Sequence, residues 1–389
     1  MPGVSSSEPR IALAEPTIGG NAAAYLEECL RTNFVSSVGP FVSRFEAAFA
    51  AAVGARHAVA CASGTAAIHL ALRVLDVGPG DEVLVPTLTF VASANPIAYV
   101  GAAPVFVDSE PRTYNLDPAL VAGELDRRAR EGRRQPAAIE VVHLLGHPAD
   151  IEPVMAAAAR HGVTVFEDAS EALGATYTAG AFAGRHVGTI GRVGAFSFNG
   201  NKLITTGGGG MLVTDDEALA RRARHLSTQA RLPGPAYDHD ELGYNYRLSN
   251  LAAALGLAQL EQLPALLDGR RANAAAYDAA IAELPGLAPA PRASWAEPSF
   301  WLYTTALRGD RPGPGRDALL AALDQAGIDS RPIWTPLHRT RLWRDAPRVG
   351  GEVAERLFAA AFSLPSSSSL DAGRRARVVD ALAAALARA

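Results

Sequence analysis

The amino-acid sequence predicts an α/β fold with a mostly parallel sheet, followed by a smaller α+β unit. Short apolar strands alternate with helical segments between residues 57 and 215, a pattern typical of a parallel sheet covered by helices on both faces. From about Leu260 onward, alanine-rich helices dominate. The 389 residues are enough for two packed units. We expect an N-terminal arm over residues 1–19, a large domain over 20–259 and a small C-terminal domain over 260–389.

The first elements expected in the large domain are two helices and a strand-helix unit. Helical spacing of apolar residues begins at Asn21 and again at Phe41, with the turn "SSVGP" between them. The segment "HAVACASGTAAIHLALRVL" then gives a short β-rich run, the turn "SGT" and a helix, which is the pattern of a βα unit. The alternation continues with a strand and helix in 81–101, strands in 103–108 and 137–146, a helix in 151–162, and strands in 163–168, 193–199 and 209–215.

The C-terminal part contains two strand-like segments between its helices, at residues 300–309 and 327–334. The Gly/Pro-rich segment 309–317 and the serine run Ser366–Ser369 are predicted to be surface loops.

Composition excludes several classes of protein. Hydrophobic residues make up 49% of the chain and charged residues 20%, and the net charge is -4 with both signs spread along the length. This balance suggests neither nucleic acid nor an anionic membrane as a partner. Two cysteines, Cys29 and Cys61, support neither a disulfide framework nor a cysteine-ligated metal site. No secretory signal and no apolar stretch of membrane-spanning length occur, so we expect a cytoplasmic protein.

Lys202 is the first candidate for chemistry. It lies in "SFNGNKLITTGGGGML", between a β-rich run and four glycines. An ordinary surface lysine requires neither a preceding β-rich run nor a following run of glycines. A lysine amine can form a Schiff base with an aldehyde, and pyridoxal phosphate is the commonest aldehyde cofactor held in this way. That cofactor needs an acid for its pyridine nitrogen, a phosphate site and a stacking aromatic ring.

Asp168 can supply the acid. It ends the apolar strand "VTVFED" and is expected at the carboxyl edge of the sheet, where open α/β folds bind ligands. A carboxylate paired with the protonated pyridine nitrogen keeps the ring an electron sink. The alternative is a helix N-cap.

The segment "SGTAA", Ser63 to Ala67, can supply the phosphate site. It opens a helix, where free N–H groups and the helix dipole bind anions. Gly64 permits close approach and Thr65 adds a hydroxyl. An ordinary capped helix would look similar. The glycine run fits neither the Walker pattern nor a dinucleotide fingerprint. We expect Gly207 to Gly210 to be backbone thinned for close packing or a tight turn into "MLVTD".

Three other residues follow strands of the predicted sheet. Phe90 can stack on a cofactor ring or belong to the core. Ser197, five residues before the lysine, can reach the phosphate from the other side. Glu171 is expected one helical turn beyond Asp168.

With these residues and "GYNYRLSN", the chain resembles the DegT/DnrJ/EryC1/StrS family of pyridoxal-phosphate sugar aminotransferases, from "TNFVSSVGPFVSRFE" to "RPIWTPLH". The resemblance implies the type I aminotransferase fold, with a seven-stranded sheet in the large domain and a small C-terminal domain. It also implies a homodimer whose two active sites lie at the subunit interface.

By this resemblance Lys202 is the Schiff-base lysine and Asp168 the partner of the pyridine nitrogen. Phe90 occupies the ring-stacking position, and Glu171 falls where many members carry glutamine. The implied phosphate ligands are Gly64, Thr65, Ala66, Ser197 and, from the neighbouring subunit, Asn245.

Within the family, "NFVSSVG", "FNGNKLITTGGGGM" and "RHLSTQAR" most resemble enzymes that aminate C4 of nucleotide-linked 4-keto-6-deoxy sugars. The expected substrates are L-glutamate and UDP-2-acetamido-2,6-dideoxy-hexos-4-ulose. Alternatives are GDP-4-keto-6-deoxymannose and dTDP-linked 3-keto or 4-keto sugars. Ser36, Ser37 and His338 are implied to face the sugar nucleotide. A related sugar dehydratase would carry histidine in place of the lysine, and a non-catalytic sensor would have lost the cofactor set.

Overall fold

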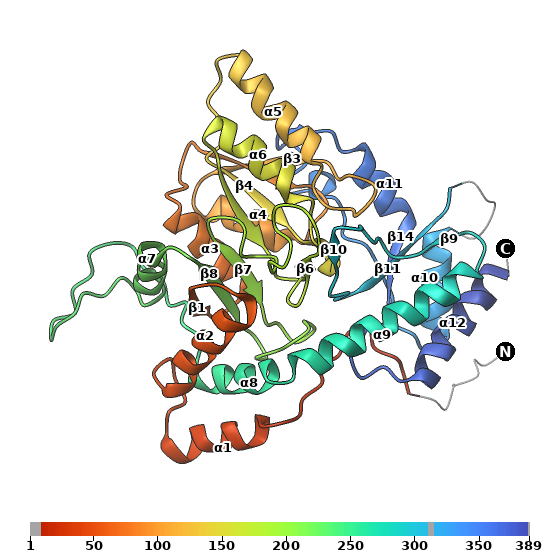
Figure 1. Cartoon of the computed structure of the whole chain (residues 1–389), viewed down its shortest axis with the longest axis horizontal. Coiled ribbons are helices and arrows are strands. Elements are labelled where there is room, and N and C mark those ends of the chain that lie inside the picture. Colours follow the sequence, from red (N-terminus) through yellow and green to blue (C-terminus); the bar gives the residue numbers. More distant parts are fainter. Residues whose placement is uncertain (1–8, 310–314, 388–389) are drawn as a thin grey trace.

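The large unit is built around one eight-stranded sheet with helices on both faces (Figure 1). The computed structural model describes residues 9–309 and 315–387. In spatial order the strands are β1 (His57–Cys61), β8 (Gly210–Thr214), β7 (Gly194–Ser197), β5 (Thr164–Asp168), β4 (Ala138–Val142), β2 (Glu82–Pro86), β3 (Ala103–Val107) and β13 (Arg348–Val349). Strand β8 runs antiparallel to β1 and β7, and the other neighbours are parallel. The prediction of a mostly parallel sheet is confirmed.

The edge strand β13 is the difference from the seven strands expected. Its residues Arg348 and Val349 come from the C-terminal part of the chain and pair with Phe106 and Val107 of β3. A two-residue strand carries no apolar run, so the sequence pattern gave no sign of it.

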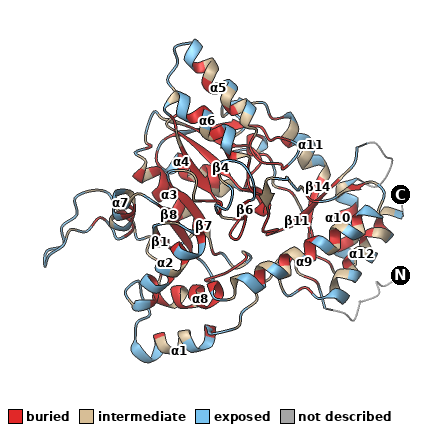
Figure 2. Ribbon diagram, in the orientation of Figure 1, coloured by how far each residue is buried: buried red, intermediate tan, exposed pale blue. Residues whose placement is uncertain are grey.

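Helices cover both faces of this sheet with apolar side chains. One face is covered by α3 (Gly64–Val74), α4 (Val91–Tyr99) and α7 (Glu217–Ser227). The other is covered by α2 (Pro40–Val53), α5 (Pro118–Arg130), α6 (Ile151–His161) and α8 (Asn250–Leu260), and α1 (Ala22–Thr32) packs on α8. The strands are accordingly buried and the outer sides of the helices exposed (Figure 2).

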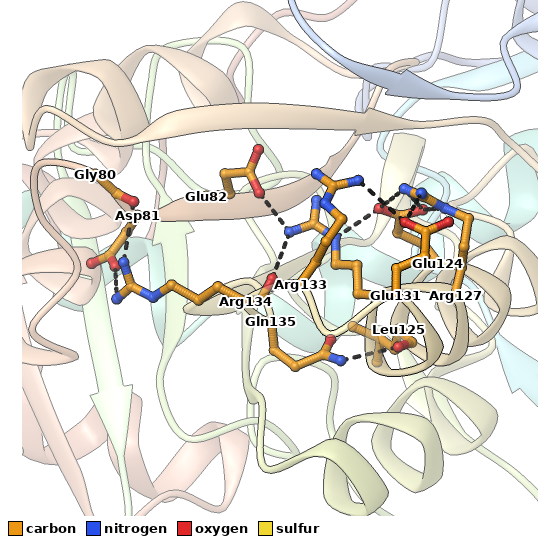
Figure 3. A network of polar contacts seen from close by, with 11 residues as sticks. Gly80, Asp81, Glu82, Glu124, Leu125, Arg127, Glu131, Arg133, Arg134 and Gln135 are labelled. Atoms are coloured by element: carbon orange, nitrogen blue, oxygen red, sulfur yellow. Dashed lines mark hydrogen bonds and ion pairs between the residues drawn. The ribbon is translucent and has the colours of Figure 1, made fainter.

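A polar network fastens α5 to the amino end of β2 (Figure 3). Arg128 is 2% exposed and bonds Glu124 one turn earlier, Nε to Oε1 at 2.7 Å, and also Glu82 at the start of β2. Arg134 Nη2 lies 2.6 Å from Oδ1 of Asp81. Because the buried guanidinium has two carboxylates, its burial does not leave an unpaired charge. This network lies at the edge of the sheet opposite to Asp168, which ends β5.

The small unit contains a four-stranded sheet in the order β12 (Arg331–Pro332), β14 (Ala361–Leu364), β11 (Tyr303–Leu307) and β9 (Leu287–Ala288). Its helices are α10 (Arg316–Gln325), α11 (Glu352–Ala360) and α12 (Ala372–Ala387). The long helix α9 (Leu263–Ala282) leads from α8 to this unit (Figure 1). A two-stranded ribbon of β6 (Thr176–Tyr177) and β10 (Ala296–Glu297) joins the two parts of the chain.

The N-terminal segment packs on the small unit. Ile11 N donates to Gly327 O at 2.9 Å, and Ser366 N donates to Leu13 O at 2.8 Å. Ser366 and Ser367 are buried, so the prediction of a surface loop is wrong for these two residues, whereas Ser369 is exposed. Their hydroxyls are satisfied internally, since Tyr303 N donates to Ser366 Oγ at 2.8 Å and Glu15 N donates to Ser367 Oγ at 2.9 Å. Part of the other predicted loop, residues 310–314, lies outside the described residues.

None of the helices in the described ranges is both long enough and apolar enough to span a bilayer.

Candidate active site

A cavity of about 340 Å³ opens at the carboxyl edge of the central strands. Its wall comes from the start of α3, from the segments after β2, β5 and β7, and from two tryptophans of the C-terminal part. The sequence-predicted residues that line it are Gly64, Thr65, Phe90, Asp168, Glu171, Ser197 and Lys202. Strands β2 and β5 are parallel members of one sheet, so the segments that follow them meet at one edge.

The first turn of α3 forms one end of the cavity. Ser63 is the N-cap, and its Oγ accepts the N–H of Ala66 at 3.1 Å. Ala66 therefore already has a hydrogen-bond acceptor, and it is not part of the cavity wall. The N–H groups of Gly64 and Thr65 belong to the first turn, which has no acceptors within its own helix. A Cβ on Gly64 would lie 2.7 Å from Cβ of Ser197, so only glycine permits this close approach.

Asp168 lies at the centre of the site and is buried. Its Oδ2 accepts the hydroxyl proton of Ser93 at 2.8 Å, and its Oδ1 accepts the N–H of Ser170 at 3.0 Å. These two hydrogen bonds fix the orientation of the carboxyl group. Asp168 thus presents a fixed carboxyl group to the cavity.

Lys202 projects into the same cavity from the turn after β7. Its side chain is 14% exposed, and Nζ lies 3.9 Å from Oε1 of Glu171. Burial lowers the pKa of Lys202 below its ordinary value, although Glu171 and Asp168 act in the opposite direction. A desolvated amine loses its proton more readily, which is what a nucleophile or a base requires.

Glu171 is fixed by the loop after β4. Its Oε2 accepts the N–H of Leu145 at 2.7 Å. Burial raises the pKa of Glu171, and the neighbouring charge of Lys202 opposes that rise. The carboxyl group therefore faces the lysine amine from a fixed position.

Three aromatic rings, those of Phe90, Trp301 and Trp334, form part of the cavity wall. Phe90, at the N-cap of α4, is 48% exposed, and its ring centroid lies 5.1 Å from that of Trp334. Trp334 stacks on Trp301 at 6.4 Å with an interplanar angle of 22°. Neither tryptophan was predicted to be a site residue, and neither were Thr89 and Ser93. Thr89 and Ser93 belong to "PTLTFVASAN", directly after a predicted strand. This position could have identified them as candidate site residues.

Besides Ala66, four predicted residues lie outside this cavity. Asn245 and Ser37 line a second, open pocket of about 500 Å³ on the surface, together with Arg231 and Arg247. Ser36 O accepts the N–H of Asn250 at 2.6 Å.

His338 is buried away from the cavity wall. Its Nδ1 lies 2.6 Å from Thr87 Oγ1, and its Nε2 lies 3.0 Å from Glu355 Oε1. Both ring nitrogens therefore already have partners within this chain.

Comparison with known proteins identifies the family. The model of the DegT/DnrJ/EryC1/StrS aminotransferase family matches residues 16–383. The chain belongs to this family. It is 41% identical to a GDP-perosamine synthase of Caulobacter vibrioides over 97% of this chain and 98% of that protein. It is also 41% identical to EpsN of Bacillus subtilis, which is assigned to the pyridoxal phosphate-dependent aminotransferases, over 96% and 95% of the two chains.

The fold agrees with this membership. The crystal structure of the aminotransferase TlmJ from Streptoalloteichus hindustanus superposes with a TM-score of 0.87 at 30% identity, over 97% of this chain and 99% of that one. The predicted family, the type I fold and the aminotransferase activity are confirmed, and the cofactor of the family is pyridoxal phosphate.

The cavity fits this cofactor. The first turn of α3 offers N–H groups to a phosphate, Asp168 offers a fixed carboxylate to a pyridine nitrogen, and Lys202 offers an amine to an aldehyde. The close approach of Gly64 to Ser197 leaves no room for a side chain at the phosphate end.

Proposed function

We propose that this enzyme moves an amino group from L-glutamate to C4 of a nucleotide-linked 4-keto-6-deoxy sugar. The amino acid becomes 2-oxoglutarate, and the ketone carbon of the sugar becomes a primary amine. The observation that carries the proposal is that Lys202 and Asp168 face one cavity in a chain of the DegT/DnrJ/EryC1/StrS aminotransferase family. Histidine in place of Lys202 would have favoured a dehydratase instead.

Lys202 and Asp168 have different roles in this reaction. Bound pyridoxal phosphate supplies an electron sink beside the Cα of the amino donor. Lys202 removes the proton from that Cα, and in the second half of the reaction it delivers a proton to C4 of the sugar. Ser93 and the N–H of Ser170 hold the carboxyl group of Asp168 in place, and this group would pair with the pyridine nitrogen of the bound cofactor.

GDP-4-keto-6-deoxymannose is the better supported substrate. It was an alternative from the sequence, and the 41% identity to a GDP-perosamine synthase over nearly the whole chain favours it. The UDP-linked 2-acetamido sugar, which the motifs favoured, becomes the second candidate. Both substrates present a ketone at C4 of a 6-deoxy sugar, so the same residues serve either one.

We also propose a homodimer with shared active sites. Asn245 and Ser37 lie together on the surface of this chain, away from its own cavity. The segment near Ser37 exposes Phe34, Val35 and Val38, and apolar side chains grouped in this way favour a protein contact. In the dimer Asn245 reaches the phosphate of the partner's cofactor, and Ser36 and Ser37 reach the sugar nucleotide.

His338 has a different role in this proposal. Leu337 N donates to Thr87 O at 2.7 Å, and Thr87 Oγ1 contacts the His338 ring. The pair fastens the segment that carries Trp334 to the end of β2. His338 therefore supports the cavity wall rather than touching the sugar directly.

The decisive experiment measures 2-oxoglutarate formation from L-glutamate with GDP-, UDP- and dTDP-linked 4-keto and 3-keto sugars. We expect turnover with the GDP-linked 4-keto sugar and a loss of roughly a thousandfold or more in Lys202→Ala. Turnover with the UDP-linked sugar alone would select the second substrate. Turnover with 3-keto sugars alone would refute amination at C4, and full activity of Lys202→Ala would refute the role of the lysine.

A further inference from the structure

Trp301, which belongs to the C-terminal part of the chain, contacts the catalytic lysine. The Nζ atom of Lys202 lies 3.7 Å from the centroid of the Trp301 ring. Trp301 is 2% exposed, and its Nε1–H donates to the carbonyl of Asn201 at 2.7 Å, directly before the lysine. One indole therefore touches both the backbone and the amine of this turn. Tryptophan offers the most favourable aromatic face for a cation–π contact with a lysine ammonium.

The backbone that carries Trp301 is held in an unusual conformation. Phe300 has φ 50° and Leu145, in the facing loop, has φ 58°, and neither is glycine. Ser299 N donates to Gly146 O at 2.9 Å, which joins the two loops. A Cβ on Gly146 would lie 2.8 Å from Trp301 N, so the approach requires glycine. Left-handed conformations of this kind persist where the surroundings fix them, and they cluster at functional sites.

A buried arginine also fixes the backbone of Trp301. Arg270 of α9 is almost completely buried, and its Nη1 donates to the carbonyl of Trp301 at 2.6 Å. Its Nε donates to Ser368 Oγ at 3.2 Å. Trp301 is thus held through its carbonyl by α9, through its neighbours by the loop after β4, and through its indole by Asn201.

We propose that Trp301 is a positioning residue that holds the ammonium form of Lys202 against its ring whenever the lysine is not bonded to the cofactor. The ring keeps the amine beside Glu171 and inside the cavity between the two half-reactions. This inference rests on the proposed role of Lys202.

The charged groups around the amine allow a quantitative test. Glu171 and Asp168 face the lysine, and Arg270 donates a hydrogen bond to the carbonyl of Trp301. Burial lowers the pKa of Lys202, and the two carboxylates raise it. The π face of Trp301 stabilises the cation and so adds to the raising contributions. Removal of the ring must therefore lower the pH at which the amine loses its proton.

The composition of the chain makes this pH measurable for one atom. Lys202 is the only lysine in the sequence. The full-length, cofactor-free protein labelled with ¹³Cε-lysine should therefore give one lysine resonance, whose chemical shift follows the protonation of Nζ. We expect the titration midpoint of Trp301→Leu to lie about 0.5 to 1.5 pH units below that of the wild type. Trp301→Phe retains an aromatic face and should lie between the two.

The matched control is Trp343→Leu, because Trp343 packs on Phe106 in the large unit rather than on the lysine. Its midpoint should equal that of the wild type. If Trp301→Leu fails to fold, the comparison of Trp301→Phe with the wild type decides. A midpoint that is unchanged or raised in the folded Trp301 variants overturns the proposal. The titration needs no turnover, so its outcome is independent of the aminotransferase assay with Lys202→Ala.

Discussion

Ser93 Oγ donates a hydrogen bond to Oδ2 of Asp168 at 2.8 Å, and both residues are buried. Ser93 belongs to the first turn of α4, and Asp168 ends β5. The hydroxyl of Thr89 lies 2.9 Å from the same Ser93 oxygen. A short chain of hydroxyl groups therefore fixes the carboxylate that faces the cofactor.

Ser93→Ala should weaken cofactor binding without disrupting the fold. It removes one of the two protein hydrogen bonds to a charged carboxylate, which costs about 1.5 to 3 kcal/mol. We expect the dissociation constant of pyridoxal phosphate to rise about 10-fold to 100-fold, measured from the visible absorbance of the bound cofactor.

The control for this prediction is Ser363→Ala in the small unit. Ser363 Oγ lies 2.8 Å from Thr304 Oγ1, so the substitution removes a buried hydrogen bond of the same length away from the cavity. Cofactor affinity should not change. Equal losses of affinity in both variants would mean that Ser93 acts only through general stability.

The four glycines after Lys202 should differ sharply in their tolerance of alanine. A Cβ on Gly210 would lie 2.4 Å from the carbonyl oxygen of Ser63, the N-cap of α3, whereas a Cβ on Gly208 would meet no atom within 4 Å. Gly210→Ala must separate β8 from the phosphate end of the site, at a cost of about 1 to 3 kcal/mol. Thermal unfolding should show a loss of stability for Gly210→Ala and none for Gly208→Ala. Equal behaviour of the two variants would contradict this assignment.

The glycine run is one feature whose structure could be predicted from the sequence alone. It predicted thinned backbone or a tight turn, and the structure contains both, with φ 80° at Gly207 and close backbone contact at Gly210. Cofactor residues that follow strands, such as Asp168 and Phe90, could be predicted because the carboxyl ends of parallel strands converge.

Trp301 could not be predicted in the same way. It lies about 100 residues from Lys202 in the sequence, and the contact depends on how the small unit packs against the large one. Strand periodicity carries no information on that packing. The buried serines 366 and 367 were misjudged for the same reason, because their partners Tyr303 and Glu15 are distant in the sequence.

Glu167→Gln should destabilise the protein at neutral pH. The fully buried carboxylate contacts Nε2 of His143 at 2.9 Å and accepts the N–H groups of Gly188, Ile190 and Gly191 at 2.7, 2.6 and 2.6 Å. Burial opposes its charge, but these donors, His143 first, hold the pKa of Glu167 below its ordinary 4.5. The amide of glutamine would turn a donor toward some of these N–H groups, at a cost of about 2 kcal/mol or more.

The pH dependence follows from the lowered pKa. The stabilisation by Glu167 is fully present above pH 4.5, the ordinary value, and is lost as the pH falls through the lower folded-state pKa. In urea unfolding, the difference between wild type and Glu167→Gln should therefore be constant from pH 6 to 8 and shrink in acid. Glu152→Gln is the control, since Glu152 is exposed and accepts the single N–H of Ala181. A difference that grows in acid would contradict the ionised state of Glu167.

Glu140 is the opposite case, a buried carboxyl group with no hydrogen-bond partner among the described residues. It lies in the middle of β4, where its backbone neighbour is Phe166 of β5, two residues before Asp168. Burial raises the pKa of Glu140 well above its ordinary value, and the charge of Asp168 raises it further. Burial and the charge of Asp168 therefore both favour the protonated form of Glu140 in the folded protein.

Glu140→Met should stabilise the protein, and more so at higher pH. The folded state holds a proton that the unfolded chain loses above about pH 4.5, so this glutamate costs more stability as the pH rises toward its folded-state pKa. We expect a gain of about 1 to 3 kcal/mol in urea unfolding at pH 8, and a smaller gain at pH 6. The matched control is Glu124→Met, which removes a buried glutamate that is paired with Arg128 and so must destabilise. A loss of stability in Glu140→Met would mean that the carboxyl group has a polar partner such as a buried water molecule.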